Sequence, residues 1–214
     1  MERYARAAAA LTAAFFLLGC GYDRGVDARL LRAAAQGDAA TVSALLKRGA
    51  SVEAVDEDGW TPLLWGAAHG DVPTVEVLLA AGADIEAETR KERESALTLA
   101  TKWNRAEVIS TLLRHGADIR RRDKIDWTAL MWASLKGRTD AIAVLLDGGA
   151  GVETTDSNGN TPLMLAARQG RADAVRVLLS RGARTGARNA DGETPASLAA
   201  AAGYPELAAL LKSR

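Results

Sequence analysis

The feature of this 214-residue chain that most restricts its fold is a dipeptide that returns at nearly constant spacing. Gly-Ala occurs at residues 49–50, 82–83, 116–117, 149–150 and 182–183, so the steps are 33, 34, 33 and 33 residues. A regular period of this length is typical of solenoids, in which small structural units stack along one direction. The sequence therefore predicts one extended array of repeats.

Residues 156–188 show what one repeat contains. Thr161 and Pro162 predict the start of a short helix, because a Thr side chain can accept from free N–H groups there and Pro suits the first helical position. Gly170 predicts the end of that helix, and a second apolar helix follows and stops at Gly182. Helices of about eight to ten residues are marginal alone in water, so each repeat must bury its apolar face against the next.

The landmarks Thr-Pro-Leu, Ala-Ala, Gly, Leu-Leu and Gly-Ala resemble those of the ankyrin repeat. The resemblance covers about residues 27–214 and implies an all-α solenoid of about six stacked repeats, each a helix–turn–helix with a short β-hairpin finger. The first and last repeats look like caps, since Arg29 replaces Pro in the first and the chain ends soon after Lys212 in the last. The implied repeats are 27–55, 56–88, 89–122, 123–155, 156–188 and 189–214.

Three repeats depart from the family pattern. The second and fourth carry Trp65 and Trp132 where the family usually has Leu, and we expect both side chains to lie in the core. The third has one extra residue in its finger and Asn104 in place of the helix-ending Gly. Gly adopts the left-handed backbone conformation most easily, and Asn is the next most tolerant residue. We therefore expect an intact third repeat with a longer, strongly charged finger.

The first 26 residues are expected to lie outside the repeats. Residues 1–19 read as a signal peptide, because their largely apolar run of 12 residues from Ala7 is too short to span a bilayer about 30 Å thick. The following Leu-Leu-Gly-Cys resembles a bacterial lipobox, which implies cleavage before Cys20, acylation of that residue and a short lipidated tether over residues 20–26. Gly21 favours the outer membrane by resemblance to Gram-negative lipoproteins. The alternatives are an ordinary signal peptide with an incidental Cys, or a buried helix.

Composition and motifs argue against catalysis. Basic and acidic residues number 27 each, so no overall charge draws the chain toward nucleic acid. The single Cys excludes an internal disulfide framework, and His69 and His115 lie in different repeats without metal-binding spacing. Nucleophile and phosphate-loop motifs are also absent from the sequence. We expect no enzyme activity, no metal and no cofactor, and we interpret acidic pairs such as Asp56 and Asp58 as turn formers.

What remains is a binding surface. By resemblance, ankyrin arrays bind proteins on a concave face made of finger tips and the exposed positions of first helices. Three tryptophans fall at such positions in successive repeats, and exposed aromatic side chains are typical interface anchors. The alternative is that each Trp only packs on a neighbouring finger. The predicted partner-binding residues are Trp60, His69, Lys102, Trp103, Trp127, Met131, Leu135 and Arg168.

Charge is unevenly distributed along the fingers, with acidic residues at the first tip and basic residues at the middle ones. A stripe of one sign would steer an acidic partner, although such runs are also common on solvated faces. The predicted stripe consists of Arg90, Lys91, Arg93, Arg120, Arg121, Arg122 and Lys124.

These features predict a monomeric, non-enzymatic scaffold that is lipid-anchored in the bacterial cell envelope, faces the periplasm and binds a protein partner through its concave face. A narrower version is an inhibitor or immunity protein against a toxin or envelope enzyme, and a chaperone of a periplasmic enzyme fits the same residues. Two other classes stay open: an enzyme or metal site built on the repeats, and a structural lipoprotein without a partner, in which the tryptophans would be buried.

Overall fold

The computed structural model describes residues 25–213, so the predictions for the signal peptide and for acylation at Cys20 lie outside the described residues. The described part contains twelve α-helices joined by turns, with one isolated antiparallel bridge between Glu88 and Ser95. The helices are α2 (Val26–Gln36), α3 (Ala39–Lys47), α4 (Pro62–His69), α5 (Val72–Ala80), α6 (Ala96–Lys102), α7 (Ala106–Arg114), α8 (Ala129–Lys136), α9 (Thr139–Asp147), α10 (Pro162–Arg168), α11 (Ala172–Ser180), α12 (Pro195–Ala201) and α13 (Pro205–Lys212).

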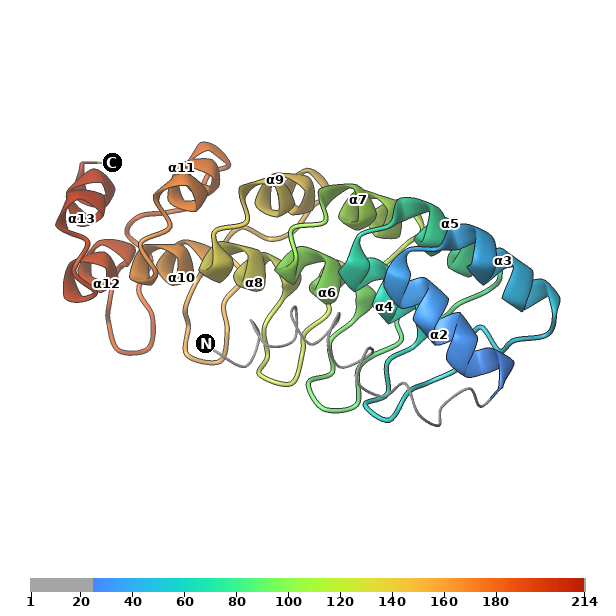
Figure 1. Ribbon diagram of the computed structural model, residues 1–214. Helices are drawn as coiled ribbons and strands as arrows, with labels where there is room; N and C mark the ends of the chain where they lie inside the picture. Colours follow the sequence, from blue (N-terminus) through green and yellow to red (C-terminus); the bar gives the residue numbers. More distant parts are fainter. Residues whose placement is uncertain (1–24, 214) are drawn as a thin grey trace.

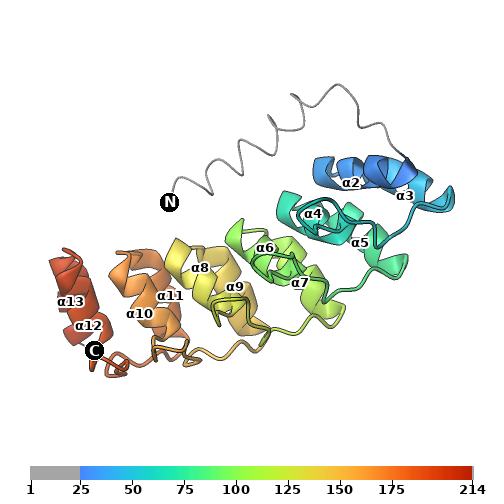
Figure 2. The ribbon, with the colours of Figure 1, turned by 90° about the horizontal axis from the view of Figure 1, so that it is seen from below.

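The helices form two parallel layers. The first helix of each repeat lies in one row, the second lies in a row above it, and the finger loops all project from the opposite edge (Figure 1). The two helices of each repeat contact each other, each first helix contacts the first helix of the next repeat, and the second helices from α3 to α11 contact one another in the same way. Successive pairs are rotated relative to one another, so the stack curves (Figure 2). The prediction of an all-α solenoid is confirmed.

Each first helix after the N-terminal one begins at a hydroxyl side chain. That oxygen accepts a hydrogen bond from the backbone N–H three residues later, which satisfies one of the free donors at a helix start. Pro occupies the first turn of α4, α10 and α12, where its missing N–H costs nothing. The capping residues are Thr61, Ser95, Thr128, Thr161 and Thr194.

Asn104 serves two neighbouring repeats. It adopts the left-handed conformation with φ 57°, as Gly137 does with φ 68° at the equivalent position of the next repeat. Its side-chain oxygen accepts the N–H of Ala141 at 3.2 Å, and its amide donates to Asp140 at 3.2 Å. Residue 138, before α9, makes no side-chain cap of its own. Asn104 therefore caps α9 from the preceding repeat, which a Gly could not do.

Side chains from one finger also hold the loop of the next. Glu53 accepts the N–H of Asp84 at 2.7 Å, and Glu86 accepts that of Asp118 at 2.8 Å. Glu153 accepts the N–H of residue 184 at 2.9 Å in the same manner. These contacts span 31 or 32 residues of sequence, so the loops at residues 84, 118 and 184 are positioned by the preceding repeat as well as by their own turns.

The core runs through the array as one continuous layer of Leu, Val, Ile and Ala side chains. Trp132 is buried with 8% of its surface exposed, as expected, whereas Trp65 is only partly buried against the core. No helix between residues 25 and 213 combines the length and apolar character needed to cross a bilayer.

Candidate functional site

The second repeat contains a tryptophan pair held by one carboxylate. The rings of Trp60 and Trp65 lie 4.4 Å apart between centroids, at an angle of 33°. One oxygen of Asp56 accepts the backbone N–H of Trp60 at 2.9 Å, and the other accepts the indole N–H of Trp65 at 3.0 Å. Asp56 therefore fixes the finger and the first helix to each other.

The fourth repeat builds the same arrangement. Trp127 and Trp132 have ring centroids 4.9 Å apart at an angle of 58°. Asp123 accepts the backbone N–H of Trp127 at 3.0 Å and the indole N–H of Trp132 at 2.6 Å. In both repeats the first Trp of the pair keeps part of its surface exposed. Each pair therefore combines a partly exposed ring with a second ring whose N–H the carboxylate binds.

Sequence reasoning missed this carboxylate. It assigned Asp56 to turn formation, which is incomplete, since the same side chain also binds the indole of Trp65. The signal was available: Asp, Trp and Trp recur with the same spacing in the second and fourth repeats, four and nine residues apart. The spacing matters because Trp needs a partner for its N–H when its ring is buried.

An ion pair occupies the corresponding place in the third repeat. Glu94 stands where the other two repeats have Trp60 and Trp127, and it pairs with Lys102. Both side chains are buried, with 8% and 7% of their surfaces exposed, and the Lys102 ammonium lies 3.4 Å from the centroid of Trp132. The prediction that Lys102 is available to a partner is therefore wrong, because a carboxylate and an aromatic ring enclose its charge.

Met131 is also inaccessible, so its prediction as a partner-binding residue is wrong. Its side chain is completely buried. The sulfur lies 3.5 Å from the backbone N–H of Thr128, at the start of α8. Met164 occupies the equivalent position in the fifth repeat and makes the same contact. Met131 and Met164, each the third residue of its helix, thus pack against the capping Thr inside the array and not against solvent.

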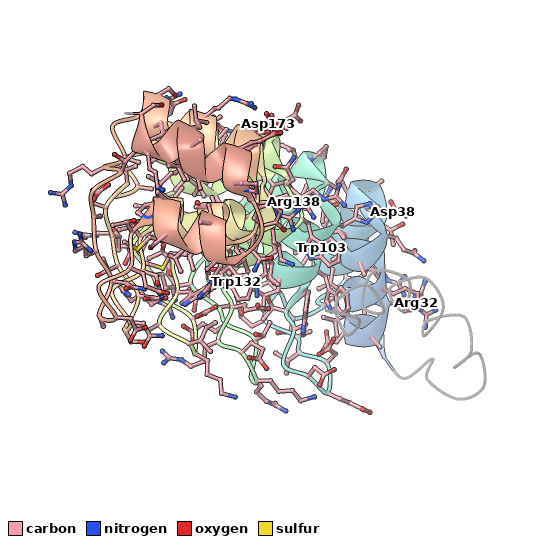
Figure 3. All side chains as sticks on the ribbon, turned by 90° about the vertical axis from the view of Figure 1, so that its left-hand side faces the viewer. Arg32, Asp38, Trp103, Trp132, Arg138 and Asp173 are labelled. Atoms are coloured by element: carbon pink, nitrogen blue, oxygen red, sulfur yellow. The ribbon has the colours of Figure 1, made fainter. Side chains whose placement is uncertain are left out.

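The other predicted residues keep some accessible surface. Trp103 follows α6 and packs partly against the core, and Leu135 in α8 is partly buried. His69 and Arg168, at the ends of α4 and α10, are exposed. Trp103 and Trp132 are labelled in the view along the stack (Figure 3). The accessible set is Trp60, His69, Trp103, Trp127, Leu135 and Arg168.

The basic residues of the middle fingers do not form a stripe of one sign, so that prediction is wrong. A period of 33 residues places the acidic residues of one finger beside the basic residues of the next. Arg121 pairs with Glu86 and Glu88 of the preceding finger at 3.2 and 2.6 Å. Lys91 pairs with Asp58, Arg93 with Glu88, Arg120 with Asp118 and Arg122 with Asp126. Arg90 donates to the backbone oxygen of Glu57, and Lys124 is exposed.

No group of three or more His, Cys, Asp or Glu side chains that could hold a metal ion occurs among residues 25–213. His115 bonds Glu76 at 3.0 Å, and the pKa of this carboxyl lies below its ordinary value, chiefly because of that bond and then of Arg114. A hollow of about 700 Å³ lies between the fifth and sixth fingers, but its Glu153 and Arg184 already pair with each other.

Comparison with known proteins agrees with the architecture. A family model described as ankyrin repeats in three copies matches residues 4–89, 86–156 and 149–214. No curated protein matches the chain.

Proposed function

Because the chain belongs to the ankyrin repeat family, whose repeats generally mediate protein–protein interactions, we propose that it is a scaffold whose partner docks on the concave face of the second to fifth repeats. The partner lies across the first helices and the bases of the fingers. It contacts the accessible set defined above, with the partly exposed Trp60, Trp103 and Trp127 at its centre.

The observation that carries this proposal is a partly exposed Trp in each of three successive repeats, on rigid support. Trp60 and Trp127 each rest on a second ring that a carboxylate holds, and Trp103 rests on the core. Side chains ordered before binding lose little conformational entropy when a partner arrives. Aromatic anchors of this kind commonly contribute most of the energy of an interface.

The finer part of the proposal concerns location. Acyl chains at Cys20 hold the array at a bacterial membrane on its periplasmic side, and the lipobox-like Leu-Leu-Gly-Cys sequence supports this. Two or more chains give stable anchoring, whereas one gives only marginal binding. An inhibitor, an immunity protein and a chaperone would all use the same face. Which of these roles applies depends on the partner.

The test is capture of partners from envelope extract by the full chain and by a variant with Trp60, Trp103 and Trp127 changed to Ala. The matched control carries Trp65→Leu and Trp132→Leu, which remove the supporting ring of each pair and keep Trp60 and Trp127. Helical content and unfolding midpoints of both variants show whether they fold. We expect the control to retain the partners and the triple variant to lose them. Equal capture by both would refute the proposed face.

A further inference from the structure

The finger loops project side by side along one edge of the array, and a carboxylate ties most neighbouring fingers together (Figure 1). At three of the four junctions, one Glu accepts a backbone N–H of the next finger at 2.7 to 2.9 Å. These residues are Glu53, Glu86 and Glu153. Named after the repeats whose helices they precede, the second to sixth fingers are residues 50–61, 83–95, 117–128, 150–161 and 183–194. The exception is the junction between the fourth and fifth fingers.

At this junction the donor is present and the carboxylate is missing. Arg120 stands where the other junctions have Glu, and Gly151 supplies the N–H of the next finger. Gly151 is exposed, and within residues 25–213 its N–H donates to no acceptor. The loop turns as in the fourth finger, because the Thr154 N–H donates to the Gly151 oxygen at 3.1 Å, just as the N–H of residue 121 donates to that of residue 118. The equivalent junctions therefore define where a carboxylate would lie.

A second tie is missing at the same junction. The other finger pairs share a backbone hydrogen bond at their tips, donated by Arg90 to Asp58 at 3.3 Å, by Lys124 to Glu92 at 3.0 Å and by Ala190 to Asn158 at 2.9 Å. Ser157 and Ile125 hold the corresponding places between the fourth and fifth fingers, and no such bond joins them in the described part of the chain. The bond that does join these two fingers runs from the Arg122 guanidinium to the Thr155 oxygen at 3.1 Å. A ligand that bridged this junction would therefore add a tie that the fold leaves open.

Arg120 gives the open position a positive charge. Its side chain is 88% exposed, and its Nε lies 3.7 Å from the Asp118 carboxylate. That distance is longer than a hydrogen bond, and exposed ion pairs contribute little, so the guanidinium keeps donors for a second carboxylate. The Arg120 side chain starts from the position at which a Glu reaches the N–H elsewhere, so a carboxylate on the Gly151 N–H lies within its reach. A backbone N–H and a guanidinium together favour an ionised acceptor.

We propose that the junction between the fourth and fifth fingers is a docking site for an Asp or Glu side chain of the protein partner. The partner's carboxylate accepts the N–H of Gly151, as a Glu of the chain does at the other junctions, and pairs with Arg120. A Gln or Asn side chain could accept the N–H but would offer no charge to the guanidinium, so the site selects the ionised group. This inference rests on the proposed function, since the carboxylate belongs to the protein that the array binds.

The test uses isotope-labelled full chain in a nonionic detergent and two short peptides. The probe is acetyl-Gly-Glu-Gly-Glu-Gly-amide, and its neutral counterpart has Gln at both Glu positions. The backbone amide signal of Gly151 should shift saturably with the acidic peptide. The amide signals of Asp84, Asp118 and Arg184 should stay in place, because each of these N–H groups already has a carboxylate acceptor. We expect about tenfold weaker binding of the neutral peptide, the size typical of a hydrogen bond to a charged group.

Arg120→Glu is the decisive variant, because it gives residues 118–120 the Asp-x-Glu pattern of residues 84–86. Its own carboxylate should accept the Gly151 N–H. The Gly151 signal should then move without peptide in the direction that the acidic peptide produces, and added peptide should no longer shift it.

Two further variants measure the contribution of the charge. Arg120→Gln should weaken binding of the acidic peptide about two- to fivefold, which is the contribution of an exposed ion pair. The matched control is Arg48→Gln, at an exposed Arg of the first repeat, and it should leave the affinity unchanged. The amide spectra of all variants check that they fold.

Four results would each overturn the proposal. They are no saturable shift of the Gly151 signal, equal shifts at Asp84 and Asp118, a full response to the peptide in Arg120→Glu, and binding of the neutral peptide or of inorganic phosphate as tight as that of the acidic peptide.

Partner capture separates this inference from the proposed function. If Arg120→Glu captures the same partners as the unchanged chain with equal yield, the docking site for the partner's carboxylate is wrong and the scaffold function stands. If the unchanged chain captures none, the scaffold function is wrong whatever the peptides do.

Discussion

The buried pair of Glu94 and Lys102 provides a sharp test of how the third repeat is held together. Changing Lys102 to Met keeps most of the side-chain volume and removes the charge. The Glu94 carboxylate, with 8% of its surface exposed, would then be buried without the cation that it contacts directly. Removing one partner of a buried ion pair typically costs about 3–5 kcal/mol. The contact of the ammonium with Trp132, 3.4 Å from the ring centroid, places the expected loss in the upper half of that range.

Urea unfolding followed by tryptophan fluorescence measures this loss. In thermal unfolding of a domain of about 150–250 residues, 1 kcal/mol corresponds to about 2–4 °C in the midpoint, so a loss of about 4–5 kcal/mol should lower the thermal midpoint by about 8–20 °C. The control is the double variant Glu94→Leu and Lys102→Met. Replacing both charges by apolar groups of similar volume is often neutral, so the double variant should recover most of the lost stability.

Two results would refute this reasoning. A loss below about 1 kcal/mol for Lys102→Met would mean that the Glu94 carboxylate finds water or another partner, as surface pairs do. A double variant as unstable as Lys102→Met alone would mean that packing around Trp132, and not the unpaired charge, is responsible.

Three further predictions concern other parts of the chain. Asn104→Ala should lower the free energy of unfolding by about 1–2 kcal/mol in urea titrations, because it removes the cap on α9 and places a Cβ at φ 57°, and Asn104→Gly should cost less because it keeps only the first loss. Lys136→Gln should raise the free energy of unfolding by less than about 1 kcal/mol at neutral pH. Because the pKa of Lys136 is lowered in the folded protein, the stability of the unchanged chain should rise toward that of this variant as pH approaches 10.5, and a constant difference in denaturation curves across that range would contradict the assignment. Cys20→Ala should give an unprocessed or membrane-released protein in cell fractionation, and acyl labelling that survives the change would reject the lipobox.

The architecture could be predicted from sequence because its determinants are local. Thr161 and Pro162 start α10, and Gly170 adopts the left-handed conformation in the turn that follows this helix. All of these residues lie within one short stretch of sequence. The same signals recur with a period of 33 or 34 residues, and each unit is too small to be stable alone. Helix, turn and stacking therefore follow from one repeat, and Asn104 could be recognised as a substitute for Gly at a left-handed position.

Accessibility was decided by the tertiary structure, since it depends on residues about one repeat away. Lys102 looks exposed from its place at a helix end, but Glu94 of its own repeat and Trp132 of the next repeat enclose it. The finger charges look like separate runs of one sign, yet stacking pairs Arg121 with Glu88, 33 residues earlier. A sequence pattern tells which side of a helix a residue occupies. Only the stack determines what covers that side, because the covering atoms belong to the neighbouring repeat.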